Sequence, residues 1–186
     1  EEMEEKLRRI SQLDSDTKLA NRQYFMSQLE SWCGTEAKDG ECRALVYLAV
    51  DDIPKLRSSL GMSRSDELVK DVAELLRGEV SQQDLLARFS ASSFALLCRR
   101  TTISEIENLA ENLRSKLDKT SYPDVDPALG PFCSIGVALI SDVQPNVQDL
   151  VNEAYNASET AREKGGNQVV LLKEESEILQ AAEQAS

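Results

Sequence analysis

The sequence predicts an α/β domain in which helices cover a central sheet. Three observations point to this class: short apolar runs with the length of buried strands, amphipathic segments between them, and no repeat or linker within the core. The chain has 186 residues, of which 41% are hydrophobic and 29% charged, so it can bury the core of one domain. We therefore expect a single α/β sandwich with a connecting segment at each end.

The first half of the chain alternates helical and strand patterns. Apolar residues at spacings of three and four predict an amphipathic helix over 2–13, and an asparagine is placed to cap a second helix over 21–32. The first helix either docks on its own domain or belongs to a longer signalling helix, and the sequence leaves both open. Residues 43–50 form an apolar run typical of a buried central strand. A short helix over 53–59 and a longer one over 65–77 follow.

The second half begins with two short β-prone runs, 84–89 and 93–99. The small residues between these runs predict a tight hairpin. The remaining elements are, in order, a helix over 103–117, a strand over 132–140, a helix over 147–164 and a last strand over 168–173. We expect the acidic tail 174–186 to be a helical connector.

The charge of the chain excludes several functions. It contains 21 Lys and Arg against 33 Asp and Glu, a formal net charge of −12, and so lacks the basic face that nucleic acid requires. It has no histidine, which excludes an imidazole base and a histidine-ligated metal. No apolar run reaches the roughly 20 residues that span a bilayer. We therefore expect a cytoplasmic protein without direct membrane insertion, whose four cysteines are reduced.

Short motifs follow one another along the chain in a fixed order. They comprise Asp14, Thr17, Leu19, Asn21 and Arg22; Gly61, Asp66 and Leu68; Arg88 and Phe94; Ser134, Ile135 and Gly136; and Ala154, Ala157, Ala161, Gly165 and Asn167. In this order they resemble the GGDEF domain, whose fold has a mainly antiparallel sheet of about five strands. The resemblance implies such a domain over 14–173, between a signalling or connector helix over 1–13 and a connector over 174–186.

The resemblance also implies where a metal site would lie. GGDEF cyclases join two GTP molecules into cyclic di-GMP, with a divalent metal held by the first Asp of a D-x-D and by an acid of the hairpin signature. In this chain Ala49 stands at the first position, and the signature reads Ser90, Ala91, Ser92, Ser93 and Phe94. Because a serine hydroxyl cannot replace the charge of a carboxylate, we expect no metal, no cofactor and no catalytic residue.

The positions that would contact the nucleotide are changed as well. The resemblance implies an Asn and an Asp that read guanine, and these positions hold Arg57 and Asp66. Asp66 is either a residual guanine contact or a favourable acid at a helix N-terminus. Arg162 replaces a phosphate-holding Lys and is the other possible nucleotide contact. Gly166 and Pro54 stand where an Arg and a Lys would hold phosphates.

The feedback site, the base of the hairpin and the end of the central strand also contain charged residues. The R-x-x-D that binds product as a feedback inhibitor is reduced to Asp84, since its Arg position is Ser81. We expect Arg88, at the base of the hairpin, to pair with a nearby acid. Asp51 and Asp52, at the end of the central strand, could be a substitute pair of metal ligands, but adjacent strand residues point to opposite faces. We therefore interpret them as solvated carboxylates.

These departures from the motif predict a regulatory function. The resemblance implies a catalytically inactive GGDEF domain that transmits signals in cyclic di-GMP pathways and controls an adjacent EAL-type domain, with a sensory domain upstream. It further suggests a regulator of type IV pili and twitching motility of the FimX kind, and a homodimer formed through the N-terminal helix. The alternative is a GTP-binding effector domain without turnover. An active diguanylate cyclase is the third reading, which the missing acids disfavour.

Overall fold

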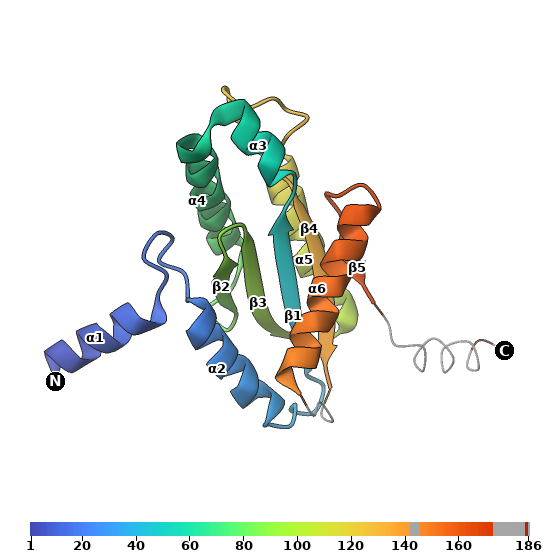
Figure 1. The fold of residues 1–186 in the computed structure, drawn as a ribbon. Helices are drawn as coiled ribbons and strands as arrows, with labels where there is room; N and C mark the ends of the chain where they lie inside the picture. Colours follow the sequence, from blue (N-terminus) through green and yellow to red (C-terminus); the bar gives the residue numbers. More distant parts are fainter. Residues whose placement is uncertain (142–145, 173–184, 186) are drawn as a thin grey trace.

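The computed structural model describes residues 1–141, 146–172 and 185. The predicted connector over 174–186 lies outside the described residues except for residue 185. Within the described ranges the elements follow the predicted order (Figure 1). They are α1 (Glu2–Gln12), α2 (Arg22–Cys33), β1 (Cys42–Val50), α3 (Ile53–Leu60), α4 (Met62–Glu79), β2 (Leu85–Ser90), β3 (Ser93–Arg100), α5 (Ile103–Asp118), β4 (Cys133–Ile140), α6 (Val147–Glu163) and β5 (Val169–Leu171).

The strands form one sheet in the order β2-β3-β1-β4-β5. β1 lies in its centre and pairs antiparallel with β3 and with β4, β2 pairs antiparallel with β3, and only β5 runs parallel to its neighbour β4. This arrangement confirms the predicted fold class of a mainly antiparallel, five-stranded sheet covered by helices. The tight hairpin β2–β3 brings its turn beside the end of β1.

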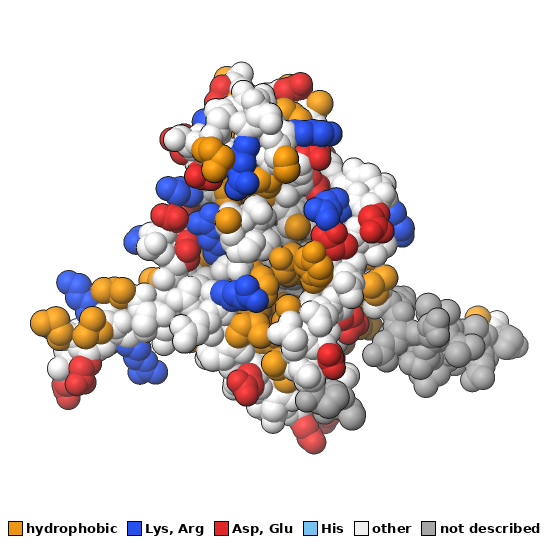
Figure 2. Space-filling model, in the orientation of Figure 1, with side chains coloured by type: hydrophobic (Ala, Val, Ile, Leu, Met, Phe, Trp, Pro, Cys, Tyr) orange, Lys and Arg blue, Asp and Glu red, His pale blue; other side chains and the backbone are white. Residues whose placement is uncertain are grey.

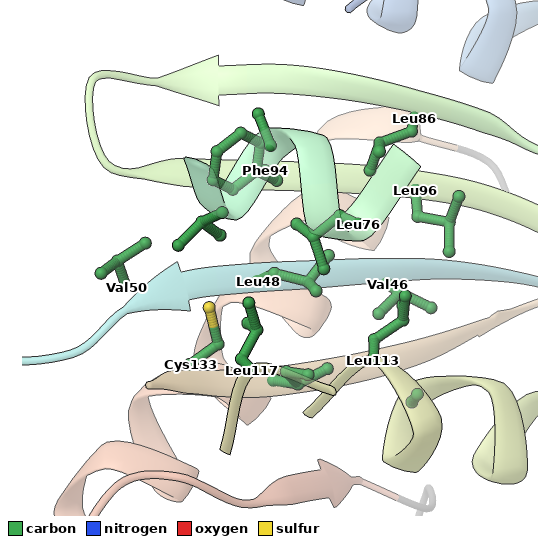
Figure 3. Close-up of a cluster of buried hydrophobic side chains, with 14 of the residues drawn as sticks. Val46, Leu48, Val50, Leu76, Leu86, Phe94, Leu96, Leu113, Leu117 and Cys133 are labelled. Carbon is green, nitrogen blue, oxygen red and sulfur yellow. The ribbon is translucent and has the colours of Figure 1, made fainter. Parts of the chain in front are cut away.

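Each face of the sheet has its own apolar core. Alternate residues of β1 point to opposite faces, so Val46 and Leu48 pack against α3, α4 and α5, whereas Leu45 and Tyr47 pack against α2 and α6. Figure 3 shows side chains of the first core, where Val46 and Leu48 of β1 lie close to Leu76 of α4 and to residues of α5. The helices thus form two layers around the sheet.

Helix α1 stands away from the body of the domain (Figure 1). It buries none of its residues, and the apolar side chains Met3, Leu7 and Ile10 are 72%, 60% and 65% exposed (Figure 2). Of the two roles considered for this helix, docking on its own domain is therefore not observed. None of the helices in the described residues has the length and apolarity that crossing a bilayer requires.

Helix α4 begins earlier than predicted. It starts at Met62, and the hydroxyl of Ser65 donates back to the carbonyl of Gly61 at 2.8 Å instead of capping the helix. Asp66 consequently lies beyond the first turn, which contains no acid. The interpretation of Asp66 as a helix N-terminal acid is therefore wrong.

Candidate functional site

The end of β1 and the β2–β3 turn lie side by side, as the resemblance implies. Ala49 is the register partner of Ser93 on β3 and of Ser134 on β4. The amide of the next residue, Val50, donates to the carbonyl of Ser92 at 3.0 Å. The fold thus preserves the geometry of a two-strand site, while the side chains that meet there are a methyl group and hydroxyls.

The polar groups of the hairpin turn bind one another. Tyr47 donates its hydroxyl to Oγ of Ser93 at 3.0 Å, and the hydroxyls of Ser93 and Ser90 are also hydrogen-bonded. The amide of Ser92 points to Oγ of Ser90 at 3.4 Å, and Ala91 is exposed without a polar side chain. Two of the three serine hydroxyls in this turn are therefore committed to structure.

Asp51 differs from its predicted state. It is 6% exposed, accepts the Ser134 hydroxyl on Oδ1 at 2.6 Å and the Asn167 amide on Oδ2 at 2.8 Å. Burial raises the pKa of Asp51 above its usual value against the opposing effect of these two hydrogen bonds. The interpretation of a solvated carboxylate is wrong for Asp51 and holds for Asp52, which is exposed. The chain leaves the strand at this point, and Asp52 has a φ of 54°.

These residues do not fit a divalent metal. Mg²⁺ prefers several anionic oxygens, whereas Ala49 and Ser92 contribute no carboxylate and both oxygens of Asp51 accept hydrogen bonds within the protein. In the part of the chain that the structure describes, no three Asp, Glu or Cys side chains converge in a way that could hold a metal.

A polar hollow of about 540 Å³ opens beside Asp51, between the start of α3 and the end of α6. Its cations are Lys55 and Arg162. Each has an acidic neighbour: Arg162 pairs with Glu159, and the ammonium of Lys55 lies 4.0 Å from Asp52. The hollow therefore has some cationic character, which these acids partly neutralise.

The two guanine-reading positions are not assembled into a site. Asp66 is an exposed residue of α4 and does not line the hollow that contains Arg162. Arg57 on α3 is half-buried, and its Nε has no hydrogen-bond partner among the described residues. The two predicted nucleotide contacts, Asp66 and Arg162, are thus held by different helices without a described contact between them.

Asp84, the remnant of the feedback motif, is bound within the domain. Its side chain is 0% exposed and accepts hydrogen bonds from both terminal nitrogens of Arg100, at 2.8 and 2.9 Å. The amide and hydroxyl of Ser81 donate to the same carboxylate at 2.9 and 3.1 Å. Burial alone would raise the pKa of Asp84, but the hydrogen bonds from Arg100 and Ser81 outweigh it and hold the pKa below its usual value.

Arg88 ties the hairpin to the segment that precedes α2. It donates to the carbonyl of Ala91 at 2.8 Å and lies 3.5 and 3.4 Å from carboxylate oxygens of Asp14 and Asp16. The prediction that Arg88 pairs with an acid is confirmed. Asp14 also accepts hydrogen bonds from the amide and the hydroxyl of Thr17, which closes the turn at 14–17.

Sequence reasoning missed the partners that these acids find. Nothing in the sequence linked Asp51 to Ser134 or to Asn167, which lie 83 and 116 positions away. Arg100 carried a usable signal, because antiparallel pairing of the predicted hairpin places it near Asp84. Leu85 pairs with Leu97, so Arg100 lies diagonally across from Asp84 and reaches the carboxylate through its long side chain.

Comparisons with known proteins agree with this geometry. The family model described as "Diguanylate cyclase, GGDEF domain" matches residues 11–168. The cyclic di-GMP phosphodiesterase NbdA of Pseudomonas aeruginosa is 28% identical over 165 residues, which cover 87% of this chain and 20% of that protein. This chain spans about a fifth to about a third of the length of such curated relatives.

Solved structures are similar over almost the whole chain. The GGDEF domain of FimX from Pseudomonas aeruginosa superposes with a TM-score of 0.76 at 26% identity, covering 87% of this chain and 99% of that chain. The coiled coil and GGDEF domain of DgcB from Caulobacter crescentus, solved in complex with c-di-GMP, reaches a TM-score of 0.81 at 22% identity. That match covers 92% of this chain and 91% of the other, and shows the shared fold.

Proposed function

This chain belongs to the GGDEF domain family, and from that premise we propose that it is a catalytically inactive member which acts as a regulatory module in cyclic di-GMP signalling. One observation carries the proposal: Ala49 and Ser92 occupy the two neighbouring strand ends where the cyclase reaction needs metal-binding acids. Phosphoryl transfer between nucleotides depends on metal ions and cations that stabilise the charge developing on phosphate. Neither of these two positions supplies a carboxylate for that task.

The remaining acids support the same proposal because each has a structural partner. Asp51 is engaged by Ser134 and Asn167, and Asp84 by Arg100 and Ser81. Moving either carboxylate onto a ligand would leave these donors without an acceptor, at a cost of about 1–3 kcal/mol for the buried Ser134 hydroxyl. The intact core and the altered site together favour a domain whose function depends on its fold and not on catalysis.

The proposed regulatory role requires a neighbour. We propose an EAL-type domain downstream and a sensory domain upstream in a longer cytoplasmic protein, since relatives such as the phosphodiesterase NbdA are about five times longer than the matched region. The likeness to the FimX GGDEF domain favours a regulator of type IV pili and twitching motility as the specific pathway. Activity of the natural protein with and without this domain tests the arrangement. If removal of this domain leaves the phosphodiesterase activity of the protein unchanged, the proposed regulation is contradicted.

Helix α1 supports a homodimer within this proposal. Met3, Leu7 and Ile10 recur at spacings of four and three, which is the repeat of a coiled-coil seam, and all three are exposed. Burial of such a stripe against a second copy would remove apolar surface from water. We therefore propose that two chains pair through α1, and light scattering of the purified chain measures this directly.

A second candidate is a GTP-binding effector domain without turnover. The hollow beside Asp51 favours it, because Lys55 and Arg162 line a space of about 540 Å³. The net charge of −12 opposes it, since a triphosphate brings further negative charge to the domain. Calorimetric titration of GTP with and without Mg²⁺ separates the two candidates. The inactive-module proposal predicts no heat of binding at micromolar GTP, and measurable heat favours the effector.

Catalytic inactivity is tested by incubating the purified chain with GTP and Mg²⁺. Formation of cyclic di-GMP contradicts the proposal, whereas unchanged GTP supports it.

A further inference from the structure

The turn between α6 and β5 has an unusual backbone. Gly165, Gly166 and Asn167 have φ angles of 117°, 75° and 50° in succession. Only glycine adopts this region freely, and an asparagine there is tolerated at a cost. A turn of this kind keeps its shape when contacts from outside hold it.

Asn167 receives such contacts from two separate elements. Its amide donates to Oδ2 of Asp51 at 2.8 Å, at the end of β1. On the other side, its Oδ1 accepts from Nη1 of Arg114 at 3.1 Å, and its Nδ2 donates to Oδ1 of Asp118 at 2.9 Å. Both partners on this side belong to α5. Asn167, two residues before β5, is therefore held between the end of β1 and helix α5.

The Asp51 side of this clamp is closely fitted. Ser134, which is fully buried, donates to Oδ1 and fixes the orientation of the carboxylate. A Cβ atom added to Gly166 would lie 3.0 Å from Oδ2 of Asp51, closer than nearly all real Cβ contacts. The glycine at 166, where the resemblance calls for arginine, thus allows the turn to close onto the carboxylate.

β5 is the shortest strand in the part of the sheet that the structure describes. It has three residues, pairs only with β4, and each of its side chains is half-exposed. A short edge strand has few hydrogen bonds of its own. The Asn167 amide donates to a carboxylate oxygen of Asp51, and such a bond is of the stronger, charge-assisted kind when the acid is ionised.

We propose that the Asp51–Asn167 hydrogen bond is a latch that holds β5 on the sheet and thereby couples the end of β1 to β5. The idea rests on the proposed function in one respect: a domain that transmits signals needs a route between its former catalytic edge and its neighbour. We expect release of the latch to free β5 while the two cores stay folded, because the buried residues of both cores lie outside β5, whose Val169 and Leu171 pack against the edge of one core.

Hydrogen exchange with mass spectrometry tests the latch on the 186-residue chain. Asp51→Asn keeps the size of the side chain but leaves one acceptor atom for two donors, Ser134 and Asn167. Gly166→Ala leaves Asp51 intact and pushes the turn away from it. We expect both variants to exchange the amides of 167–171 at least about tenfold faster than the wild type, with β1 and β3 unchanged. Asp52→Asn, at an exposed neighbour, is the matched control and should change nothing.

Two results overturn the latch. The first is unchanged protection of 167–171 in either variant. The second is an equal loss of protection in β1 and β3, which would make Asp51 a general stabiliser of the fold. The experiment uses no nucleotide and no adjacent domain. A failed latch therefore leaves the inactive-module proposal standing, whereas cyclic di-GMP production would remove that proposal without affecting the latch.

Discussion

Replacement of Asp84 by alanine should strongly destabilise the domain. The carboxylate is 0% exposed and accepts two hydrogen bonds from Arg100 and two from Ser81. Removing one partner of a buried ion pair costs about 3–5 kcal/mol, because the other charge loses its compensation. The Arg100 side chain is 18% exposed and borders a hollow of about 410 Å³, so water can reach the guanidinium. We therefore expect the lower limit of the range, about 3 kcal/mol.

Urea unfolding followed by circular dichroism measures this effect. With a slope of about 2 kcal/mol per molar urea, the midpoint of Asp84→Ala should fall by about 1.5 M at an unchanged slope. Asp39→Ala is the matched control, since Asp39 is an exposed acid that lines the same hollow. We expect it to stay within about 0.5 kcal/mol of the wild type.

The pH dependence gives a second check on the same residue. Because the folded-state pKa of Asp84 is lowered below its unfolded-state value, its contribution to stability is fully present above the unfolded-state pKa. The contribution disappears as the pH falls through the folded-state pKa. The difference in stability between wild type and Asp84→Ala should therefore shrink on acidification. A variant within about 0.5 kcal/mol of the wild type at neutral pH refutes the reasoning.

Three other variants, one of them a double substitution, test separate parts of the structure. Gly136→Ala should cost about 3 kcal/mol in urea unfolding, because the new Cβ would lie 2.0 Å from the carbonyl oxygen of Ala154; a stable variant would contradict this packing. Leu7→Lys combined with Ile10→Lys should leave the unfolding midpoint unchanged but abolish the dimer in light scattering, and a persistent dimer would exclude α1 as the interface. Arg88→Gln should lower the free energy of unfolding by about 1–2 kcal/mol, because it loses the bonds to the hairpin turn and to Asp14. An unchanged urea midpoint would contradict a stabilising role for Arg88.

The sequence was sufficient to predict the elements whose patterns are local. The apolar run at 43–50 and the alternating runs around the small residues 90–92 became the central strand and the hairpin. Helix starts were harder. The apolar repeat predicted a helix from residue 65, whereas α4 begins at Met62, directly after Gly61 with its φ of 83°.

The missing metal-binding acids could be predicted from the sequence, whereas the hydrogen-bond partners of Asp51 could not. Ala49 and Ser92 could be identified from motif position alone, and the β1–β3 register brings these strand ends together. The burial of Asp51 could not be foreseen, because it depends on Ser134 and Asn167 from distant parts of the chain. Local sequence shows that a carboxylate ends a strand, whereas only the tertiary fold shows which donors surround it.

The central claim is that this GGDEF domain does not make cyclic di-GMP because its metal-binding acids are absent. The most direct measurement incubates the purified chain with GTP and Mg²⁺ beside an active cyclase domain and separates the products by chromatography. We predict no cyclic di-GMP from the wild type. Ala49→Asp with Ser92→Glu should give little, because Arg57 and Gly166 still replace nucleotide contacts. Cyclic di-GMP from the wild type, or appreciable turnover by the double variant, would contradict the account.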